Sequence, residues 1–502
     1  MKNKNVYLVK INKKINIYDG KSHTTNDIIK LLYNIEKSMT PTYIYIYNLN
    51  DFKKYILYQL YKAGYTYTIN FNLKNKEYRG YIDSNNNLYF LVLRFKNIYI
   101  KIINLNMIFK KNTLYKIPVN KTYKNLQNII KKYGTKNTTG SYAINNFFNY
   151  YIKKYSLKTK NKVFIKTKES TNKIIYYSLM GGLNLLNPLK KNQIIKNVNI
   201  YDVNSMYPYI LLTHKLPYST PKKYYGEYIQ DEKYPLYIQH IKVDFKEKKI
   251  PFLNFSKNYN LNTLENIKSS HGMLIDLYLN SIDLKLFIEQ YTINEIYYID
   301  GIKFKATNKI FADYIKKLYR LKQKNNDNDM MKTFHKGLMN TLYGKMGQKK
   351  EIYKKHIEIK EKKVIFKKLD KIETDANYPA ITSFVSAYAR QIMITEIEKN
   401  KDSFIYCDTD SIHLENKEIK TSKKIGAFKE EISGATAKYV GLKQYMYQKG
   451  KIKKIVNAGA SEEITRQIKS FKNYKKGTEI IYKKKYYDEE KKETIKKLKY
   501  KI

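Results

Sequence analysis

The 502-residue sequence contains one cysteine, Cys407, and no tryptophan. A single thiol cannot form an intramolecular disulfide or a zinc site built from cysteines. Acidic residues are also scarce: 44 Asp and Glu stand against 96 Lys and Arg, a formal net charge of +52. No run approaches the roughly 20 apolar residues that span a bilayer, and the N-terminal stretch lacks the apolar core of a secretory signal. We expect a protein without disulfides or membrane spans that acts near its site of synthesis.

The positive charge favours a polyanionic partner, because each phosphate that a Lys or Arg neutralises releases condensed counterions. Coding bias is an alternative explanation, since an AT-rich gene yields much Asn, Ile, Lys and Tyr without selection for binding. The 53 tyrosines are explained better by this bias and by core packing than by base stacking. Charge alone therefore supports nucleic acid only in part.

The hydrophobic pattern predicts a protein of α/β and α+β class with several domains. Residues 1–115 are rich in strand-forming residues, with a helix beginning near residue 56. Helical spacing of apolar residues recurs at 281–290, 309–324, 330–343 and 381–399, and residues 216–260 are irregular and strand-like. Residues 404–414 predict a hairpin, and residues 421–502 are basic.

Acidic residues stand beside two apolar strands in this acid-poor chain. Asp202 ends one strand, and Asp408 and Asp410 lie at the turn of the predicted hairpin. Such carboxylates are costly to bury unless they are paired or bind a metal. They suit Mg²⁺, which takes its other ligands from water and substrate phosphates, and phosphoryl transfer through two metal ions needs such a clamp. Either segment alone is weak evidence, because an Asp at a hairpin turn is usually a turn former.

A third segment places basic, aromatic and glycine residues on one predicted helix. The residues at three- and four-residue spacing are Lys332, Lys336, Asn340, Tyr343 and Gly344. They share one helix face, which in the simplest alternative is a solvated basic stripe. However, lysine suits a triphosphate, a flat ring can stack on a base, and glycine permits close backbone approach. Together the three segments predict a nucleotide-adding site.

The segments YDVNSMYP (201–208), KGLMNTLYG (336–344) and YCDTDS (406–411) resemble, in this order, motifs A, B and C of the family B DNA polymerases. The resemblance covers residues 175–500 and is closest to the protein-primed branch, especially the polymerases of small Bacillus-type tailed phages. It implies a right-hand polymerase of palm, fingers and thumb, behind an N-terminal domain of the ribonuclease-H-like exonuclease type. The implied partners are template and primer DNA, dNTPs, a terminal protein as primer, and two Mg²⁺ ions, which Mn²⁺ can replace. Strand displacement is implied as well.

The resemblance assigns roles to matching positions. The implied catalytic residues are Asp202, Asp410 and Asp408, and the implied metal ligands are Asp202, Asp410 and the Val203 carbonyl. The residues implied to bind the nucleotide are Met206, Tyr207, Lys324, Lys336, Asn340 and Tyr343, with Tyr207 excluding a 2′-hydroxyl. Those implied to contact DNA are Gly181, Gly182, Ser205, Lys332, Thr341, Gly344, Lys443 and Tyr445. Two departures are Thr341 in place of the usual Ser and Leu179 in place of the Tyr of the YxGG motif.

The resemblance also implies domain boundaries. An exonuclease-like domain takes residues 1–150, a linker 151–190, the palm and fingers 191–420, and the thumb and C-terminal region 421–502. Two insertions of this branch are expected at 216–275 and 347–379. The first is placed to contact a terminal protein and DNA, and the second to enclose downstream DNA.

The nuclease motifs of the N-terminal domain are degenerate. Lys10 and Asn12 stand in the acidic places of the first motif, and Lys53 stands in that of the second. Another register would let Asp51 serve, and Asp19 is a further acid nearby. The third motif, YxxxD, is missing between residues 123 and 151. Lysines in place of metal ligands repel Mg²⁺ by roughly several kcal/mol at short range. We therefore predict a nuclease-like fold without 3′–5′ proofreading.

Several alternatives remain open at this point. A basic DNA-binding replication factor of the same fold is one, although the presence of Asp202, Asp410 and Lys336 argues against it. A reverse transcriptase usually has two adjacent aspartates, whereas Thr409 separates them here. Protein priming rather than RNA priming is favoured only by the insertion-like segments. The AT-rich coding suggests a phage protein in the host bacterial cytoplasm, with a mitochondrion or a linear plasmid-bearing organelle as the alternative.

Overall fold

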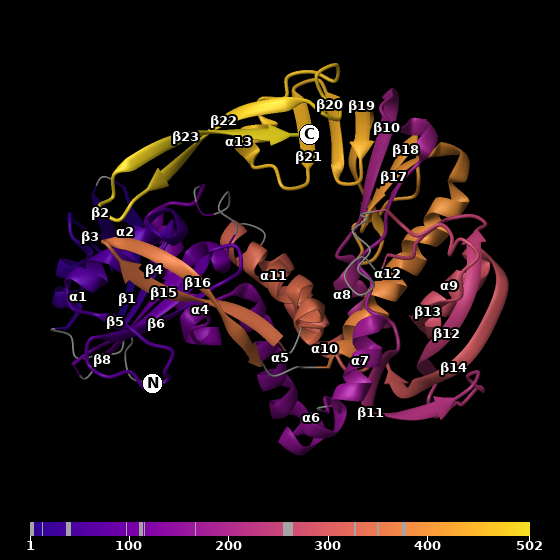
Figure 1. Cartoon of the computed structure of the whole chain (residues 1–502), viewed down its shortest axis with the longest axis horizontal. Helices are drawn as coiled ribbons and strands as arrows, with labels where there is room; N and C mark the ends of the chain where they lie inside the picture. The colour runs from indigo at the N-terminus through magenta and orange to yellow at the C-terminus, as the bar shows by residue number, and fades with distance from the viewer. Residues whose placement is uncertain are drawn as a thin grey trace.

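The structure is a computed structural model that describes residues 5–12, 14–36, 42–96, 98–109, 114, 116–165, 167–254, 265–325, 328–348, 351–373 and 378–502. The N-terminal domain lies on one side, a second large sheet with its helices lies on the other, and C-terminal strands bridge the two (Figure 1). This arrangement is the α/β and α+β multidomain class that the sequence predicts. None of the helices in the described ranges is long and apolar enough to cross a membrane.

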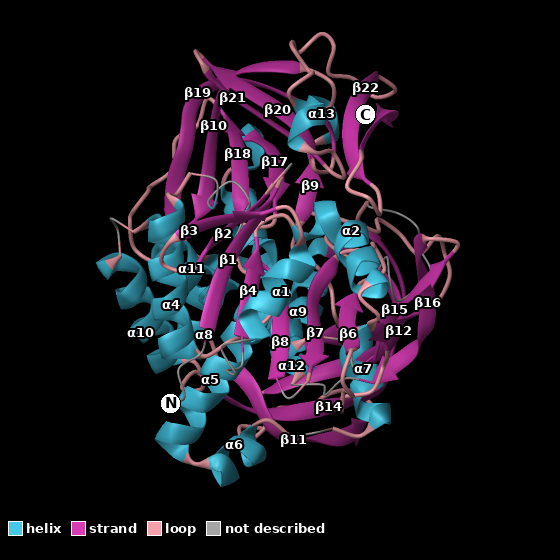
Figure 2. Ribbon diagram, turned by 90° about the vertical axis from the view of Figure 1, so that its left-hand side faces the viewer, coloured by secondary structure: helices cyan, strands magenta, loops and turns pink. Residues whose placement is uncertain are grey.

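The N-terminal domain is built on a mixed sheet whose described strands follow the order β3-β2-β1-β4-β8-β7-β6-β5. The strands are β1 (Asn5–Ile11), β2 (Ile15–Tyr18), β3 (Ser22–Thr25), β4 (Thr42–Ile46), β5 (Thr66–Tyr67), β6 (Glu77–Ile82), β7 (Leu88–Phe95) and β8 (Ile98–Asn104). Helices α1 (Ile28–Glu36) and α2 (Leu49–Lys62) lie on one face (Figure 2). Ile44 and Ile46 pack toward these helices, whereas Tyr45 packs into the core on the other face. Burial on both faces explains why the central strands are almost continuously apolar.

Helices connect this domain to the rest of the chain. They are α4 (Val119–Tyr133), α5 (Thr139–Tyr155), α6 (Leu157–Val163) and α7 (Glu169–Tyr177), with the short η1 (Leu105–Met107) before them. α5 runs across residue 150 and packs against α11 (Asp329–Met346). The two helices approach closely at Gly337, where an added Cβ would lie 2.7 Å from Cγ2 of Thr139. Helix α11, which carries lysines predicted to bind the triphosphate, is therefore packed against α5.

The second large sheet has the order β21-β20-β19-β10-β18-β17-β9 in the described part of the chain. Its strands are β9 (Asn184–Leu186), β10 (Ile194–Val203), β17 (Phe404–Asp408), β18 (Ser411–Glu415), β19 (Phe428–Gly441), β20 (Gln444–Lys449) and β21 (Ile452–Asn457). β17 and β18 confirm the hairpin predicted over residues 404–414. The short helices η2 (Pro188–Lys190) and η3 (Lys401–Ser403) flank the sheet strands in sequence.

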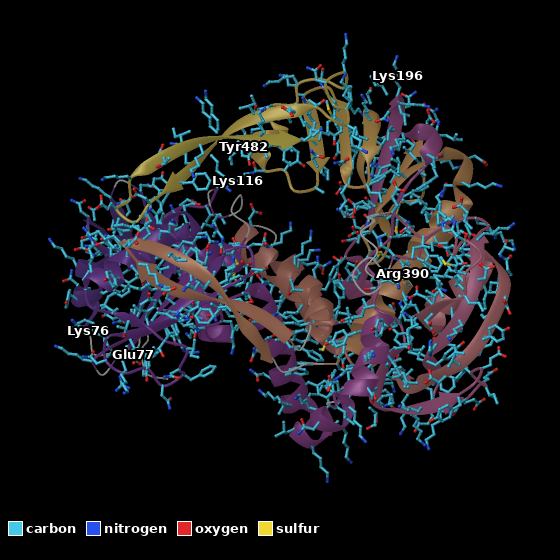
Figure 3. The ribbon with its side chains drawn as sticks, viewed as in Figure 1. Lys76, Glu77, Lys116, Lys196, Arg390 and Tyr482 are labelled. Carbon is cyan, nitrogen blue, oxygen red and sulfur yellow. The ribbon has the colours of Figure 1, made fainter. Side chains whose placement is uncertain are left out.

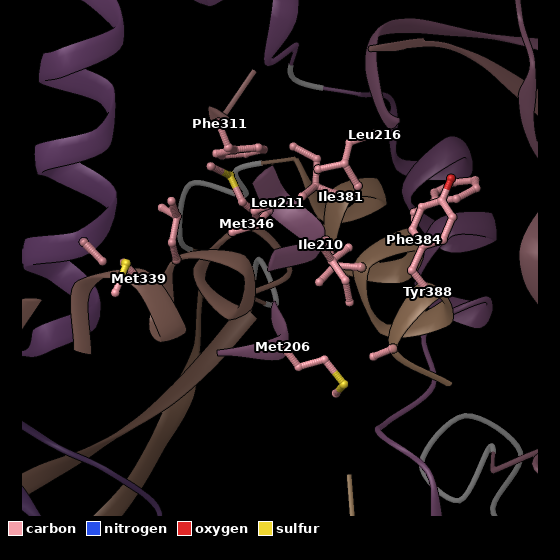
Figure 4. Close-up of a cluster of buried hydrophobic side chains, with 14 of the residues drawn as sticks. Met206, Ile210, Leu211, Leu216, Phe311, Met339, Met346, Ile381, Phe384 and Tyr388 are labelled. Carbon is pink, nitrogen blue, oxygen red and sulfur yellow. The ribbon is translucent and has the colours of Figure 1, made fainter. Parts of the chain in front are cut away.

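Four helices of this half match the predicted ones closely, namely α9 (Ser281–Gln290), α10 (Ala312–Lys324), α11 and α12 (Pro379–Lys399). A further helix, α8 (Met206–Thr213), lies in a segment where no helix was predicted. An apolar cluster joins α8, α11 and α12, with Met206, Ile210, Met339 and Phe384 among its buried members (Figure 4). This shared core fixes the helix that carries the predicted nucleotide-binding residues over the sheet that carries the predicted aspartates.

The two predicted insertions form separate substructures. Residues 216–275 contribute to a four-stranded described sheet of β11 (Leu216–Tyr225), β14 (Tyr291–Thr307), β12 (Leu236–Glu247) and β13 (Ile275–Asn280). Residues 347–379 include the hairpin of β15 (Glu351–Lys360) and β16 (Lys363–Glu373). Parts of both predicted segments, at 255–264, 349–350 and 374–377, lie outside the described residues.

Three distant segments meet at the N-terminal domain. The β15–β16 hairpin inserts Ile357 and Val364 into the core beside α2. The hairpin of β22 (Glu479–Tyr487) and β23 (Glu493–Lys501), which follows the short helix α13 (Glu462–Thr465), reaches the same place. There Tyr487 stacks on Phe52 with ring centroids 4.2 Å apart, and Glu489 accepts a hydrogen bond of 2.9 Å from the Val364 backbone N–H. The C-terminal strands thereby close a bridge from the second sheet to the first domain.

Candidate active site

The sheet register brings the three predicted aspartates to one place. β18 lies between β10 and β17, and its first residue, Ser411, pairs with Asp202 on one side and with Asp408 on the other. Asp410 occupies the turn between β17 and β18. Its carbonyl accepts a 2.8 Å hydrogen bond from the Val203 N–H, which ties the turn to the end of β10. Segments that are 200 residues apart in sequence therefore present their carboxylates together.

The turn is held from below by the segment that resembles the YxGG motif. Thr409 has a left-handed backbone (φ +64°), which is unusual for a β-branched residue. Its N–H donates a 2.7 Å hydrogen bond to the Leu183 carbonyl. A Cβ on Gly182 would lie 2.7 Å from Thr409 Cγ2, so only glycine allows this approach. Gly181 has no neighbour within 4 Å of an added Cβ, so its side of the loop is open.

A buried arginine that the sequence analysis missed anchors this loop. Arg390 of α12 donates hydrogen bonds to the carbonyls of Met180 (3.2 Å) and Gly181 (2.5 Å) (Figure 3). It also forms a fully buried, two-point ion pair with Asp283 of α9, with N–O distances of 2.9 and 2.5 Å. The only signal in the sequence was a single charged residue, Arg390, within the otherwise uncharged stretch of residues 379–395. Arg390 thus positions the loop under the turn of Asp410.

The aspartates line a cleft of about 440 Å³. Of the predicted site residues, the lining includes Asp202, Tyr207, Asn340, Tyr343, Asp408, Asp410 and Tyr445. It also includes residues that were not predicted, namely Ile200, Thr409, Ser411, His413, Glu431, Tyr447 and Lys454. Motifs A, B and C thus converge on one hollow.

Burial and the neighbouring carboxylates make it costly to ionise Asp410. Burial, followed by the charges of Asp202 and Asp408, raises the pKa of Asp410 to about 7. Lys429 forms an ion pair of 2.8 Å with Asp202, and Lys443 contacts Asp408. A carboxylate whose pKa is raised by neighbouring carboxylates is a place where a divalent cation gains binding free energy.

The donor set suits a hard divalent cation such as Mg²⁺ or Mn²⁺. Asp202 at the end of β10 and Asp410 in the turn between β17 and β18 offer hard oxygen ligands. Within the described residues, no three side chains of His, Cys, Asp or Glu are grouped so that they could hold a metal ion by themselves. A pair of carboxylates with water and substrate phosphates as further ligands is the usual Mg²⁺ arrangement. Cys407 is fully buried and burial raises its pKa, so it is no metal ligand.

Two tyrosines and an asparagine form the opposite wall of the cleft. Tyr207 of α8 stacks on Tyr343 of α11, with centroids 4.0 Å apart and planes at 20°. Burial, followed by the neighbouring Tyr343, raises the pKa of Tyr207, so its hydroxyl stays protonated. The Oδ1 atom of Asn340 is buried without a hydrogen-bond partner and is therefore ready to accept one.

Other predicted residues lie around the cleft. Ser205 precedes α8 with a left-handed backbone (φ +57°), and the side chain of Met206 is buried in the cluster of Figure 4. Thr341 donates its hydroxyl proton to the Gly337 carbonyl within its own helix. Gly344 is exposed at the end of the same helix face.

Lysines of α10 and α11 gather beside the site. Lys332 is half-buried and Lys336 is exposed on α11. Burial, and then the positive charges of Lys336, Lys332 and Lys429, lower the pKa of Lys322 on α10. The predicted Lys324 is exposed and is not among these charges. Lys322 was not singled out by the sequence reasoning, because nothing local distinguishes it from Lys324.

The N-terminal domain has a hollow of its own where the degenerate first nuclease motif lies. It measures about 390 Å³ and is lined by Leu8, Lys10, Asn12, Asn16, Ile17, Tyr18, Ser22, His23, Thr24, Tyr47 and Val119. This lining contains no carboxylate. Lys53 does not line it, since its ammonium contacts the Asn86 carbonyl. Asp51 is also absent from the lining, and Asp19 pairs with His23 at 3.3 Å on its rim.

Comparison with known proteins identifies the family to which this chain belongs. A family profile described as DNA polymerase type B, organellar and viral, matches residues 6–430. The DNA polymerase of Bacillus phage phi29 is 34% identical over 344 residues, which cover 63% of this chain and 59% of the relative. That of Streptococcus phage Cp-1 is 33% identical over 261 residues, or 50% of this chain and 46% of the relative. The chain thus aligns with about half to three fifths of the length of these curated relatives.

Solved structures extend the likeness of fold to the whole chain. The phi29 DNA polymerase in complex with primer-template DNA and incoming nucleotide superposes with a TM-score of 0.87, at 24% identity and with 100% of both chains covered. Its complex with single-stranded DNA gives a TM-score of 0.84 at 24% identity, again with full coverage of both chains. The fold is therefore the right-hand architecture with an exonuclease-like N-terminal domain that the resemblance implied.

Proposed function

Because the chain belongs to the organellar and viral type B DNA polymerases, we propose that it is a DNA-dependent DNA polymerase that adds dNTPs to a primer. The observation that carries the proposal is the convergence of Asp202 and Asp410 in one cleft with Tyr207, Asn340 and Tyr343. A protein that only binds DNA does not require residues of all three motifs to line one cleft. The relatives named above are DNA polymerases, which supports the same reading.

In this proposal Asp202 and Asp410 hold two divalent cations, Mg²⁺ or Mn²⁺, and the Val203 carbonyl completes their shell. When bound, the ions activate the primer 3′-hydroxyl and stabilise the leaving pyrophosphate. Asp408 adds negative charge and receives Lys443, which steadies the primer terminus together with Tyr445. These side chains hold the reacting groups in place, and positioning is most of what phosphoryl transfer requires of a protein.

The remaining wall selects the nucleotide. The Tyr207 ring lies flat against Tyr343 and fills the space where a 2′-hydroxyl would enter, which favours deoxyribonucleotides. Asn340 offers its free acceptor to the nascent base pair. Lys336, Lys332 and Lys322 supply positive charge to the triphosphate, and lysine suits this role as a compact point charge.

Primer extension tests the proposal. Wild type is expected to extend a labelled primer with Mg²⁺, whereas Asp410→Ala is expected to lose extension by about a thousandfold or more. Asp402→Ala is the matched control, because Asp402 is an exposed aspartate just before β17. No extension by wild type would leave the alternative of a DNA-binding factor of the same fold, and equal extension by wild type and Asp410→Ala would refute the role given to Asp410.

We further propose protein-primed, strand-displacing synthesis with a terminal protein as partner, in the cytoplasm of a phage-infected bacterium. The end of β11 and the loop that follows it expose apolar side chains, with Tyr225 83% and Ile229 84% exposed, and exposed apolar side chains of this kind favour a protein partner. Extension on a partly duplex template without helicase tests displacement. A Tyr225→Ser and Ile229→Ser double variant is expected to lose initiation on a supplied terminal protein while it still extends a DNA primer.

We also propose that the N-terminal domain does not proofread. Its cavity presents Lys10 and Asn12 and no carboxylate, so it cannot hold the two metal ions of a 3′–5′ exonuclease. No degradation of 3′-labelled single-stranded DNA is expected with Mg²⁺ or Mn²⁺. Degradation that is abolished by deletion of residues 1–150 but kept in Asp202→Ala would refute it.

A further inference from the structure

A lysine outside the three motifs forms an ion pair with Asp202, one of the two aspartates proposed to hold the metal ions. Lys429 lies on β19, directly opposite Asp202 in the register of β10 and β19. Its ammonium is 2.8 Å from Oδ2 of Asp202, and their side chains are 43% and 20% exposed. The backbone register of two long strands therefore places the two side chains beside each other.

A second carboxylate gives Lys429 an alternative anchor. Glu431, two residues along the same strand face, is 3.5 Å from the Lys429 ammonium. Glu431 also receives Lys454 from β21, at 3.4 Å, and both Glu431 and Lys454 line the cleft of the aspartates. Glu431 therefore keeps a cation whether or not Lys429 stays beside it.

Lys429 also lies within reach of the triphosphate lysines. Its positive charge is one of those that lower the pKa of Lys322, together with Lys336 and Lys332. Lys429 thus stands between two groups of opposite charge, the aspartates of the sheet and the lysines of α10 and α11. A divalent cation at Asp202 would repel an ammonium that stays at hydrogen-bond distance from the same carboxylate.

We propose that Lys429 is a positioning residue that serves as an internal counter-ion: it holds Asp202 in the metal-free enzyme and moves toward the nucleotide triphosphate when a divalent cation binds. This inference rests on the proposed polymerase function. It predicts that metal and nucleotide bind cooperatively, because the nucleotide offers the displaced ammonium a new partner. It also gives a reason for the presence of Lys429 beside the aspartates of the cleft.

Binding of Mn²⁺ to the full chain, without DNA or nucleotide, tests the inference. Electron paramagnetic resonance of free Mn²⁺ measures the affinity directly and needs no catalysis. Lys429→Met is expected to bind Mn²⁺ about tenfold more tightly than wild type, since the competing cation is gone. Lys429→Gln serves as a second neutral variant with the same expectation. Lys429→Arg keeps the charge and is expected to stay within about twofold of wild type.

Two controls separate this effect from a general loss of charge. Lys451→Met removes an exposed lysine at the turn between β20 and β21 and should leave Mn²⁺ affinity unchanged. The gain must vanish in the double variant Lys429→Met with Asp202→Ala. An unchanged or weakened affinity in both neutral variants, with folding verified by circular dichroism, would overturn the inference.

A nucleotide measurement completes the test. Adding a dNTP that matches a bound template, with a dideoxy-terminated primer, should tighten Mn²⁺ binding several-fold more in wild type than in Lys429→Met. Failure of this inference would leave primer extension by wild type intact but the affinities of Lys429 variants unraised. Failure of the proposed function would instead appear as no primer extension by wild type, whatever the Mn²⁺ affinities are.

Discussion

The two large sheets of this protein each carry a hollow of similar size, about 440 Å³ in the second sheet and about 390 Å³ in the N-terminal domain. The first is lined by Asp202, Asp408 and Asp410. The second has Lys10 on β1 and Asn12 directly after β1, and no carboxylate in its lining. Both domains are nevertheless packed around well-buried apolar cores. A fold is maintained by its core, so the N-terminal domain keeps its fold although no carboxylate lines its hollow.

The largest contrast is expected in activity. Asp202→Asn keeps the size of the side chain but removes a metal-binding charge, and primer extension should fall about a thousandfold. Single-turnover incorporation of one dNTP measures it. Lys10→Gln is the matched change of one charge in the other hollow, and it should leave the incorporation rate within about twofold. A comparable loss in both variants would mean that the N-terminal hollow takes part in synthesis.

The polar anchors under the two hollows should differ in strength. Arg390→Met leaves Asp283 buried without its partner, so the free energy of unfolding should fall by about 3–5 kcal/mol. In the N-terminal domain, Asn48 is a neutral anchor that exchanges two hydrogen bonds, of 2.7 and 3.2 Å, with the Ile11 backbone beside Asn12. Asn48→Ala should cost only about 1–3 kcal/mol. Urea denaturation of each variant measures the difference, and equal costs would contradict the view that a charged anchor distinguishes the active cleft.

Asp410 in the cleft of the second sheet should also make the free energy of unfolding depend on pH. The pKa of Asp410 is raised from 3.8 to about 7, so the folded state binds its proton more tightly than the unfolded state does. Ionisation of Asp410 therefore destabilises the metal-free fold, increasingly as the pH rises from about 4 to about 7, and fully above that. Asp410→Asn should remove this cost and increase the free energy of unfolding at pH 8 in EDTA by about 2 kcal/mol, a figure discounted for solvent screening.

The measurement is thermal or urea unfolding at pH 5 and pH 8 without divalent metal. The gain from Asp410→Asn should be larger at pH 8 than at pH 5. Mn²⁺ should stabilise wild type at pH 8 and should stabilise the variant much less. A variant that is less stable than wild type at pH 8 in EDTA would show that Asp410 is held by attractive contacts that outweigh its repulsion.

The sequence was a good guide wherever the signal is local. Helices α9 and α12 and the hairpin of β17 and β18 follow from apolar spacing and turn residues, and the three motifs identified six of the residues that line the cleft, whereas seven lining residues were not predicted. Contacts set by long-range register were beyond it. The pairing of β10 with β19, which brings Lys429 to Asp202, joins residues 227 positions apart and leaves no trace in either segment.

The same limit explains the second nuclease motif. Lys53 was expected in the acidic place of the second nuclease motif, but its ammonium contacts the Asn86 carbonyl, and burial lowers its pKa. A side chain on a helix after a strand can face either the sheet edge or a neighbouring hairpin, and a motif match cannot decide between them. Only Lys10 therefore opposes a metal ion in the N-terminal hollow.

The smallest effect is expected from a double variant that adds carboxylates to the N-terminal hollow and so makes it more like the cleft of the aspartates. Lys10→Asp with Asn12→Glu would restore both acidic places of the first nuclease motif, and the unfolding free energy should change by only about 1 kcal/mol at low salt, since Lys10 is half-buried at the cavity wall. No nuclease activity is expected on 3′-labelled single-stranded DNA, because Lys53 and Asp51 do not line the hollow and no further carboxylate does so. Digestion by this variant with Mn²⁺ would show that a third acidic group can reach the site, with Asp19 on the rim as the first residue to substitute.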